Sequence, residues 1–283
     1  MDAGRPSATA MAVAVSRGSH RAYDQPPWVL DDPYAQLLAG PAGPDIRASE
    51  EAVFAESARR QSRSSIVVRA RYAEDRLLAG GYHQYVILGA GLDSFAWRRP
   101  GLLGQMRVFE VDHPATQAWK RARADDLGLP VREGHTFVPV DFEAEPLETA
   151  LNRARLDWSQ PVFFSWLGVI IYLTTNAVEA TLRTIAACAP GSEAVLSYDA
   201  SEPFLDEAAR EMVHTEAEMV AAAGEPYRLT FSPAEAETLV RRCGLAVAEH
   251  LTPAEVYERY FSGRADGLRP STAERLMAAR VHH

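Results

Sequence analysis

A glycine-rich turn directly follows a short apolar segment in this chain. Tyr85-Val-Ile-Leu88 is typical of a buried β-strand, and Gly89-Ala-Gly91 and the carboxylate of Asp93 come next. Glycine adopts backbone angles that other residues resist, and its missing side chain lets the backbone approach a ligand closely. The pattern predicts a turn that binds a nucleoside, and a purely structural tight turn is the alternative.

The residues after this turn argue against a dinucleotide. A dinucleotide fingerprint places a third glycine three positions after the second, at the start of a long helix that holds the pyrophosphate. Here that position is Ser94, and Pro100-Gly101 ends any helix within about two turns. A smaller cofactor without a pyrophosphate is therefore favoured over NAD.

Two carboxylates stand at the end of the next apolar segment, residues 107–111. Glu110 and Asp112 could accept hydrogen bonds from the ribose hydroxyls of a nucleoside, because open α/β sheets bind ligands at the carboxyl ends of their strands. The alternative for Asp112 is that it caps the helix expected after His113-Pro114. The two roles are compatible with each other.

Two further strand ends carry polar and aromatic groups. Asp141-Phe142 follows residues 136–140, so the carboxylate could accept from an adenine amino group while the ring covers the base. Ser165-Trp-Leu-Gly168 ends the apolar segment 162–166 at the same edge. The alternatives are structural: a turn with Phe142 in the core, and a buried tryptophan.

The order of these segments predicts the fold class. Short apolar strands alternate with helical stretches, which is typical of a parallel sheet covered by helices on both faces. The expected strands are 85–88, 107–111, 136–140, 162–166, 194–198 and 245–249, with helices at 114–127, 146–154 and 176–189. The sequence therefore predicts an α/β protein.

The ends of the chain and one internal stretch are less regular. Residues 1–18 are small and polar, and we expect a mobile start. Helical patterns cover residues 50–78 and 202–225, and another helix is expected to begin at Ser232-Pro233. The composition of Glu274–Val281 favours a helix, whereas the fold favours a strand.

Composition excludes several classes of function. The net charge of −9 and the pI near 5.4 argue against a nucleic-acid groove. No apolar run reaches the roughly 20 residues that span a bilayer, and the start of the chain lacks the apolar core of a signal peptide. Cys188 and Cys243 are too few for a disulfide framework or a zinc site. We expect a cytoplasmic protein without nucleic-acid, membrane or metal partners.

Several segments together resemble the leucine carboxyl methyltransferase family of class I S-adenosylmethionine-dependent methyltransferases. They are Asp32-Pro-Tyr-Ala35, Arg69-Ala-Arg71, Val86 to Asp93, Phe109 to Pro114, Val140-Asp-Phe142, Trp166-Leu-Gly168 with Tyr172-Leu-Thr174, and Arg259 to Asp266. The similarity runs from Ala8 to Val281 and is greatest to the bacterial branch linked to polyketide and other natural-product O-methylation.

The resemblance implies a single methyltransferase domain over residues 1–283. It would consist of an N-terminal helical cap (1–80), a cofactor-binding core (81–200), an inserted helical lid (201–232) and the C-terminal part of the core (233–283). The expected fold is a Rossmann-like, mostly parallel sheet with helices on both faces.

The resemblance also implies a cofactor, S-adenosylmethionine, with S-adenosylhomocysteine as the product. The residues expected to bind it are Gly89, Ala90 and Gly91 under the methionine part, Asp112 and His113 at the ribose, Asp141 and Phe142 at the adenine, Ser165, Trp166 and Leu167 after the fourth strand, and Arg69 at the carboxylate. Phosphatase-methylating relatives carry a glutamate where this chain has Leu167. That departure speaks against a protein C-terminus as the methyl acceptor.

We expect the acceptor to be a small molecule with an acidic or phenolic group, and the protein to be a monomer or homodimer. Candidate substrate-binding residues are Tyr23, Arg63, Tyr172, Tyr198 and His214, and no residue announces itself as catalytic. A carboxylate acceptor needs no base at neutral pH, whereas a hydroxyl does. The alternatives are a nitrogen, carbon or peptide-carboxylate acceptor, a nucleoside-binding protein without turnover, and an NAD-dependent dehydrogenase.

Overall fold

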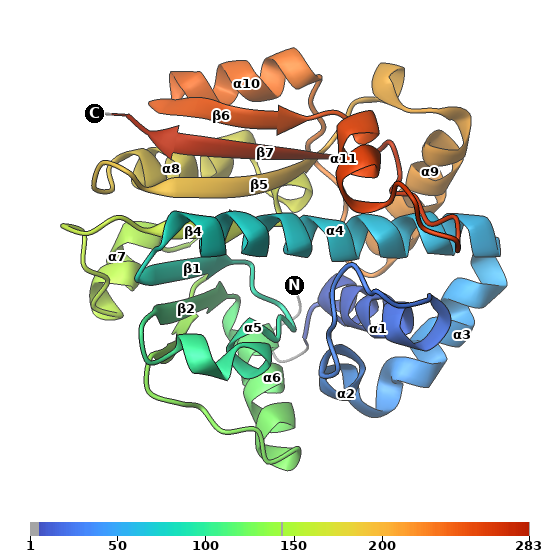
Figure 1. Ribbon diagram of the computed structural model, residues 1–283, viewed down its shortest axis with the longest axis horizontal. Helices are drawn as coiled ribbons and strands as arrows, with labels where there is room; N and C mark the ends of the chain where they lie inside the picture. The colour runs from blue at the N-terminus through green and yellow to red at the C-terminus, as the bar shows by residue number, and fades with distance from the viewer. Residues whose placement is uncertain (1–5, 143, 283) are drawn as a thin grey trace.

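Seven β-strands form one mixed, mostly parallel sheet in the part of the chain that the structure describes (Figure 1). The computed structural model describes residues 6–142 and 144–282. The strand order is β3-β2-β1-β4-β5-β7-β6, and of these seven strands β7 alone runs opposite to the other six. The predicted α/β fold class is confirmed.

The elements have the following bounds. The strands are β1 (Gln84–Leu88), β2 (Arg107–Asp112), β3 (His135–Pro139), β4 (Phe163–Trp166), β5 (Glu193–Asp199), β6 (Leu245–Leu251) and β7 (Glu274–Val281). The α-helices are α1 (Ala8–Tyr23), α2 (Ala35–Ala39), α3 (Gly43–Val53), α4 (Glu56–Gly80), α5 (Phe95–Arg98), α6 (Pro114–Asp126), α7 (Leu147–Arg153), α8 (Thr175–Ala186), α9 (Glu207–Ala222), α10 (Pro233–Arg242) and α11 (Pro253–Tyr260). Short 3₁₀ turns lie at Gly40–Ala42, Pro100–Leu102, Ile170–Tyr172 and Glu202–Phe204.

The sheet is buried on both faces, which explains why its strands are almost continuously apolar. In β1, Val86 and Leu88 face a core formed with α7, α8 and α10, whereas Tyr85 and Ile87 face a second core formed with α4, α5 and α11. In Figure 1 the long helix α4 lies in front of the sheet and runs roughly along its strands. This packing fixes the carboxyl ends of β1, β2 and β4 side by side.

The expectation of a mobile start is wrong for the described residues. Helix α1 begins at Ala8, directly after the cap residue Ser7, whose hydroxyl accepts from the N–H of Ala10. Its apolar side buries Met11 and Val15 in a third cluster with α2, α5 and α6. Residues 1–5 lie outside the described part of the chain.

The C-terminal segment is a strand, as the fold and not the composition predicted. Glu274–Val281 pairs with β5 and β6 in the interior of the sheet. The start of α10 at Ser232-Pro233 agrees with the sequence and carries a capping box with Glu235. Among the described residues, no helix is long and apolar enough to cross a membrane.

Candidate functional site

A cavity of about 400 Å³ opens at the carboxyl ends of β1, β2 and β4. This size is typical of small-molecule and cofactor sites, and the edge is the one where open α/β sheets bind ligands. The glycine turn and the segments after β2, β3 and β4 form its floor, while α1 and the residues after α9 cover it. The elements that line the cavity are therefore distant in sequence.

The glycine turn has the geometry that requires glycine. Gly89 and Gly91 have φ angles of +66° and +50°. A Cβ on Gly89 would lie 2.3 Å from Cγ2 of Val169, and one on Gly91 would lie 3.3 Å from Cβ of Ala10 in α1. The turn is therefore in close contact with the residues around the cavity, and Gly89, Ala90 and Gly91 all line it.

Asp112 and His113 follow β2 at the cavity. The Asp112 carboxylate accepts hydrogen bonds from the backbone N–H groups of Gly91 and, at 2.6 Å, of His113. Burial raises the pKa of Asp112, and these two N–H groups act in the opposite direction. The cap of α6 is His113, whose Nδ1 accepts from the N–H of Ala115, so Asp112 is not the capping residue.

Glu110 does not belong to the cavity, which corrects the prediction that it binds ribose. Its side chain is fully buried and forms an ion pair with Lys120, and its other oxygen lies 3.0 Å from Nε2 of His135. Burial alone would raise the pKa of Glu110, but Lys120 and His135 lower it. Glu110 is part of a buried charged cluster beneath α6.

Three arginines line the cavity: Arg17, Arg69 and Arg228. Arg69 from α4 pairs with Glu274 at 2.8 Å, and burial alone would lower its pKa, but this carboxylate raises it. A guanidinium has five donors, so the pair leaves Arg69 able to bind a second carboxylate. The sequence did not single out Arg17 of α1, which reaches the cavity from the segment expected to be mobile.

Of the residues predicted to bind the cofactor after β3 and β4, four line the cavity and one does not. Asp141, Phe142, Ser165 and Leu167 line the cavity, as the sequence predicted. Trp166 does not, and its expected contact with the cofactor is corrected. Its side chain is fully buried in the core with α7 and α8, because alternate residues of a strand point to opposite faces.

A carboxylate holds the cover of the cavity together. Glu225, just after α9, accepts from the hydroxyls of Ser7 and Thr9 and from the N–H groups of Ala8 and Thr9, at 2.5–3.2 Å. On the other side, the N–H of Arg228 donates to the carbonyl of Ile171 at 2.7 Å. We call residues 7–9 with Glu225 the Glu225 clasp. No local sequence signal indicates it, because its two halves are more than 200 residues apart.

The five candidate substrate-binding residues do not come together. Tyr172 lines the cavity, whereas Tyr198 is buried and shares a hydrogen bond of 2.9 Å with His250. The side chain of His214 is 78% exposed and lies 3.4 Å from Glu218. Both corrections follow from tertiary packing, since neither residue faces the cavity.

Tyr23 and Arg63 line a second cavity, of about 220 Å³, between α1, α3, α4 and α9. Arg63 is already engaged there, with both oxygens of Asp24 at 2.7 and 2.8 Å. Glu216 of α9 lines this cavity too and accepts from the hydroxyl of Tyr227 at 3.4 Å. The ring of Tyr227 contacts the ring of Tyr172, which lines the first cavity.

Two partly buried acids, Asp199 and Glu216, lie near Tyr172. Burial and the neighbouring carboxylates of Glu274 and Glu216 raise the pKa of Asp199 to about 8. Burial likewise raises the pKa of Glu216 to about 7. Both groups therefore titrate near neutral pH, and the charge beside Tyr172 changes in this pH range.

Comparisons with known proteins agree with one another. The family model described as leucine carboxyl methyltransferase matches residues 10–186, more than half of the chain. A Bacillus subtilis protein named "Putative S-adenosyl-L-methionine-dependent methyltransferase YktD" is 37% identical over 209 residues, which are 71% of this chain and 67% of that protein. A Mycolicibacterium gilvum protein of the same general name is 33% identical, over 68% of this chain and 65% of its own length. The chain thus spans about two thirds of these relatives.

Two solved structures have the same fold over almost their whole length. A Streptomyces avermitilis structure, described as a "duf574 family protein", has a TM-score of 0.66 at 19% identity. The match covers 98% of this chain and 98% of that one. A structure from Thermobifida fusca, described as a "putative methyltransferase", has a TM-score of 0.62 at 17% identity and covers 100% of this chain and 97% of its own. At these identities the likeness shows the fold alone.

Proposed function

The chain belongs to the leucine carboxyl methyltransferase family of S-adenosylmethionine-dependent methyltransferases, and we propose that it methylates an oxygen atom of a small molecule. The acceptor would carry a carboxylate or hydroxyl group, and the reaction would serve secondary metabolism. Because the relatives are matched over about two thirds of their length, the acceptor and partners belong to this proposal.

The residues around the cavity fit the cofactor chemically. Gly89 and Gly91 leave room for close backbone approach, and Asp112 offers carboxylate oxygens to ribose hydroxyls. Arg69 offers a guanidinium to the methionine carboxylate. The apolar side chains of Val140 and Phe142, which line the cavity, offer a surface to the adenine ring. These contacts remain predictions for each residue.

The observation that carries the small-molecule proposal is the cover over the cavity. The first turn of α1, beside the glycine turn, and residues 224–228 line the cavity and are joined through the Glu225 clasp. A partly covered cavity restricts access from solvent and favours a small acceptor over a folded protein surface. Leu167, where phosphatase-methylating relatives carry glutamate, points the same way.

The chemistry requires positioning above all. When bound, S-adenosylmethionine supplies a methyl group on a positively charged sulfur, which is displaced in line by the acceptor oxygen. The chain's own residues would hold the reactants in one orientation and keep water out. A carboxylate acceptor is ionised at neutral pH, whereas a hydroxyl acceptor would give up its proton to a base.

The first test is a thermal shift with titration calorimetry, comparing S-adenosylmethionine, S-adenosylhomocysteine and NAD. A ligand at 100 times its dissociation constant adds about 2.7 kcal/mol to the free energy of unfolding, which is a readily visible shift. We expect stabilisation by both sulfur nucleosides and none by NAD. Stabilisation by NAD alone would contradict the cofactor assignment and favour the dehydrogenase alternative.

The second test identifies the acceptor atom. The protein is incubated with S-adenosylmethionine and matched sets of small phenols, carboxylic acids and amines, and with peptides that end in a free carboxylate. Formation of S-adenosylhomocysteine with only the phenols or acids is the expected result. Turnover confined to amines or peptides would replace the proposal by one of the alternatives, and cofactor binding without turnover on any set would favour a non-catalytic binder.

A further inference from the structure

We propose that Asp32 is a positioning residue for the cofactor site, although it does not line the cavity. It lies in the Asp32-Pro-Tyr-Ala35 segment, before α2, and its side chain is 1% exposed. Its carboxylate orients one arginine that faces the cavity and the serine that ends the glycine turn. The inference rests on the proposed cofactor binding and assigns it a residue outside the cavity.

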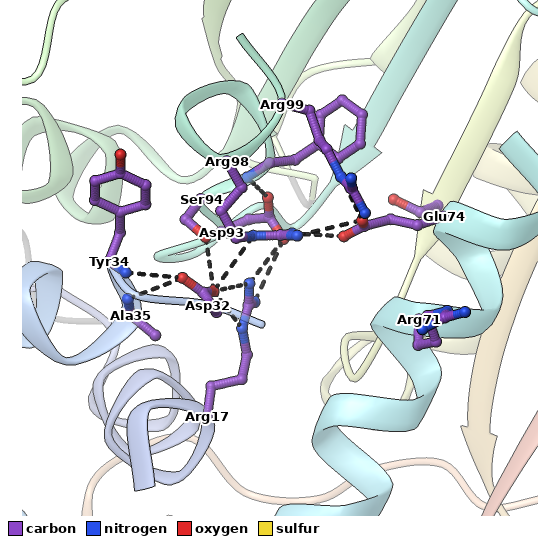
Figure 2. A network of polar contacts seen from close by, with 12 residues as sticks. Arg17, Asp32, Tyr34, Ala35, Arg71, Glu74, Asp93, Ser94, Arg98 and Arg99 are labelled. Atoms are coloured by element: carbon purple, nitrogen blue, oxygen red, sulfur yellow. Dashed lines mark hydrogen bonds and ion pairs between the residues drawn. The ribbon is translucent and has the colours of Figure 1, made fainter. Parts of the chain in front are cut away.

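The two oxygens of Asp32 have separate tasks. Oδ1 accepts the backbone N–H groups of Tyr34 and Ala35 at 3.0 and 3.1 Å, which fixes the carboxylate at the start of α2. Oδ2 accepts from Nε and Nη2 of Arg17, at 3.0 and 2.7 Å, and from the hydroxyl of Ser94 at 2.6 Å. Figure 2 shows these contacts converging on Asp32.

Arg17 carries the arrangement to the cavity. From α1 it also reaches Oδ2 of Asp93, at 3.3 Å from both Nη1 and Nη2, and both Arg17 and Asp93 line the cavity. Asp93 in turn accepts the N–H of Phe95 at 2.7 Å through its other oxygen. Asp32 thus holds Arg17 in the orientation in which its two Nη atoms contact Asp93, just after the glycine turn.

Ser94 extends the network to α4. Its hydroxyl accepts from Nε of Arg98 at 2.9 Å, and Arg98 pairs with Glu74 of α4 at 2.5 Å. Burial alone would raise the pKa of Asp32, but Arg17, Arg98 and the Ser94 hydroxyl lower it, so Asp32 is ionised. The network joins α1, the glycine turn and α4 through one buried carboxylate.

Removing the charge of Asp32 would leave Arg17 with its longer contacts to Asp93 alone. A buried guanidinium that loses its best carboxylate seeks a new partner, because an unpaired buried charge is unfavourable. Arg17 would then turn toward Asp93 and the cavity, and Ser94 would keep at most a neutral acceptor. The expected result is a glycine turn that is less ordered and binds the cofactor less tightly.

The experiment compares Asp32→Asn with Asp24→Asn. Asp24 is a matched control because it is another buried carboxylate near the N-terminal helices. It accepts hydrogen bonds from Nε and Nη2 of a buried arginine, Arg63, which does not line the cofactor cavity. The dissociation constant of S-adenosylhomocysteine is measured by calorimetry for the wild type and both variants. Hydrogen exchange of residues 89–95 is measured without ligand.

We expect Asp32→Asn to weaken S-adenosylhomocysteine binding about tenfold or more, as loss of a partner that orients a binding group commonly does. Exchange at residues 89–95 should become faster in the same variant. Asp24→Asn should lower the melting temperature while leaving both quantities within about twofold of the wild type. Equal weakening in both variants, or unchanged binding in Asp32→Asn, would overturn the inference.

Ser94→Ala keeps the test decisive if Asp32→Asn does not fold. It removes one contact of Asp32 and should weaken binding about threefold, again with faster exchange at residues 89–95; unchanged binding and exchange would overturn the inference. A wild type that does not bind S-adenosylhomocysteine would instead contradict the proposed function, so the two failures are distinguishable.

Discussion

Asp112 shows how one carboxylate can hold the backbone of a site and remain available to a ligand. It accepts N–H groups from Gly91 and His113, and it lines the cavity. Two backbone hydrogen bonds leave lone pairs free on a group that can accept about four. The same residue therefore shapes the glycine turn and presents oxygens to a ribose.

We predict that Asp112→Ala weakens S-adenosylhomocysteine binding about tenfold to a hundredfold. Hydrogen bonds to a charged group contribute about 1.5–3 kcal/mol each, and the substitution removes those to the ribose. Calorimetry measures the effect, and Asp125→Ala, at an exposed position of α6, is the control. Unchanged affinity together with a large loss of stability would assign Asp112 a structural role only.

Glu110 illustrates a buried charge with a structural role. Its partner Lys120 is the only lysine of the chain, and both side chains are at most 1% exposed. We predict that Glu110→Gln lowers the free energy of unfolding by about 3–5 kcal/mol, because it leaves the ammonium buried without its carboxylate. Urea denaturation measures this. Glu51→Gln, which breaks a more exposed pair with Arg47, should cost no more than about 0.5 kcal/mol. Similar losses in the two variants would contradict the prediction.

At the residue level, local strand-end signals predicted most, though not all, of the named residues that line the cavity. The glycines and Asp112 follow directly from a strand end, and the structure places them at one edge. Glu110 could not be separated from Asp112 in this way, because its partners Lys120 and His135 lie 10 and 25 residues further along the chain. Such pairing depends on tertiary packing.

At the level of elements, α1 is the largest departure from expectation. Its small and polar residues suggested a mobile start, yet Val15 is fully buried against the helices around the glycine turn. Helix formation here depends on tertiary contacts more than on intrinsic propensity. The contacts come from residues far along the chain, such as Trp97 and Glu225.

We predict that Glu225→Gln accelerates dissociation of S-adenosylhomocysteine about tenfold. The glutamate accepts four hydrogen bonds from residues 7–9. In a glutamine the amide NH2 replaces one carboxylate oxygen, and it cannot accept the hydrogen bonds that this oxygen accepted. The cover should then open more often. Stopped-flow displacement measures the rate, and Glu218→Gln is the control because that side chain is 72% exposed on α9. Equal rates for the wild type and Glu225→Gln would show that the cover does not limit ligand release.

The C-terminal strand shows why the fold class was easier to predict than the secondary structure of this one segment. In β7 the residues Leu276, Met277, Ala278 and Ala279 are all buried, so the strand has no alternation of apolar and polar positions. A short, wholly apolar run fits a buried helix as well as a central strand. The sheet decides between them, because β7 fills the space between β5 and β6.

Over the whole molecule, buried acids of two kinds should set the dependence of stability on pH. The pKa of Asp24 is lowered to about 2 by Arg63 and His20 against the effect of burial, so its contribution to stability is lost as the pH falls. Asp199, Glu216 and Glu50 are the opposite kind. Burial raises their pKa values, to about 8 for Asp199 and about 7 for the other two.

We predict that the protein is most stable near pH 5 and loses stability between about pH 5 and 8. In this range the folded state retains protons on Asp199 and Glu216 that the unfolded chain has released, so their contribution is present below the unfolded pKa and lost as the pH passes the folded pKa. Asp199→Asn, which cannot ionise, should flatten this decline. Urea midpoints measured from pH 4.5 to 8.5 test both statements. A decline of equal slope in the variant would exclude Asp199 as a source, and stability that rises through this range would mean that the acids near Tyr172 are ionised in the folded protein.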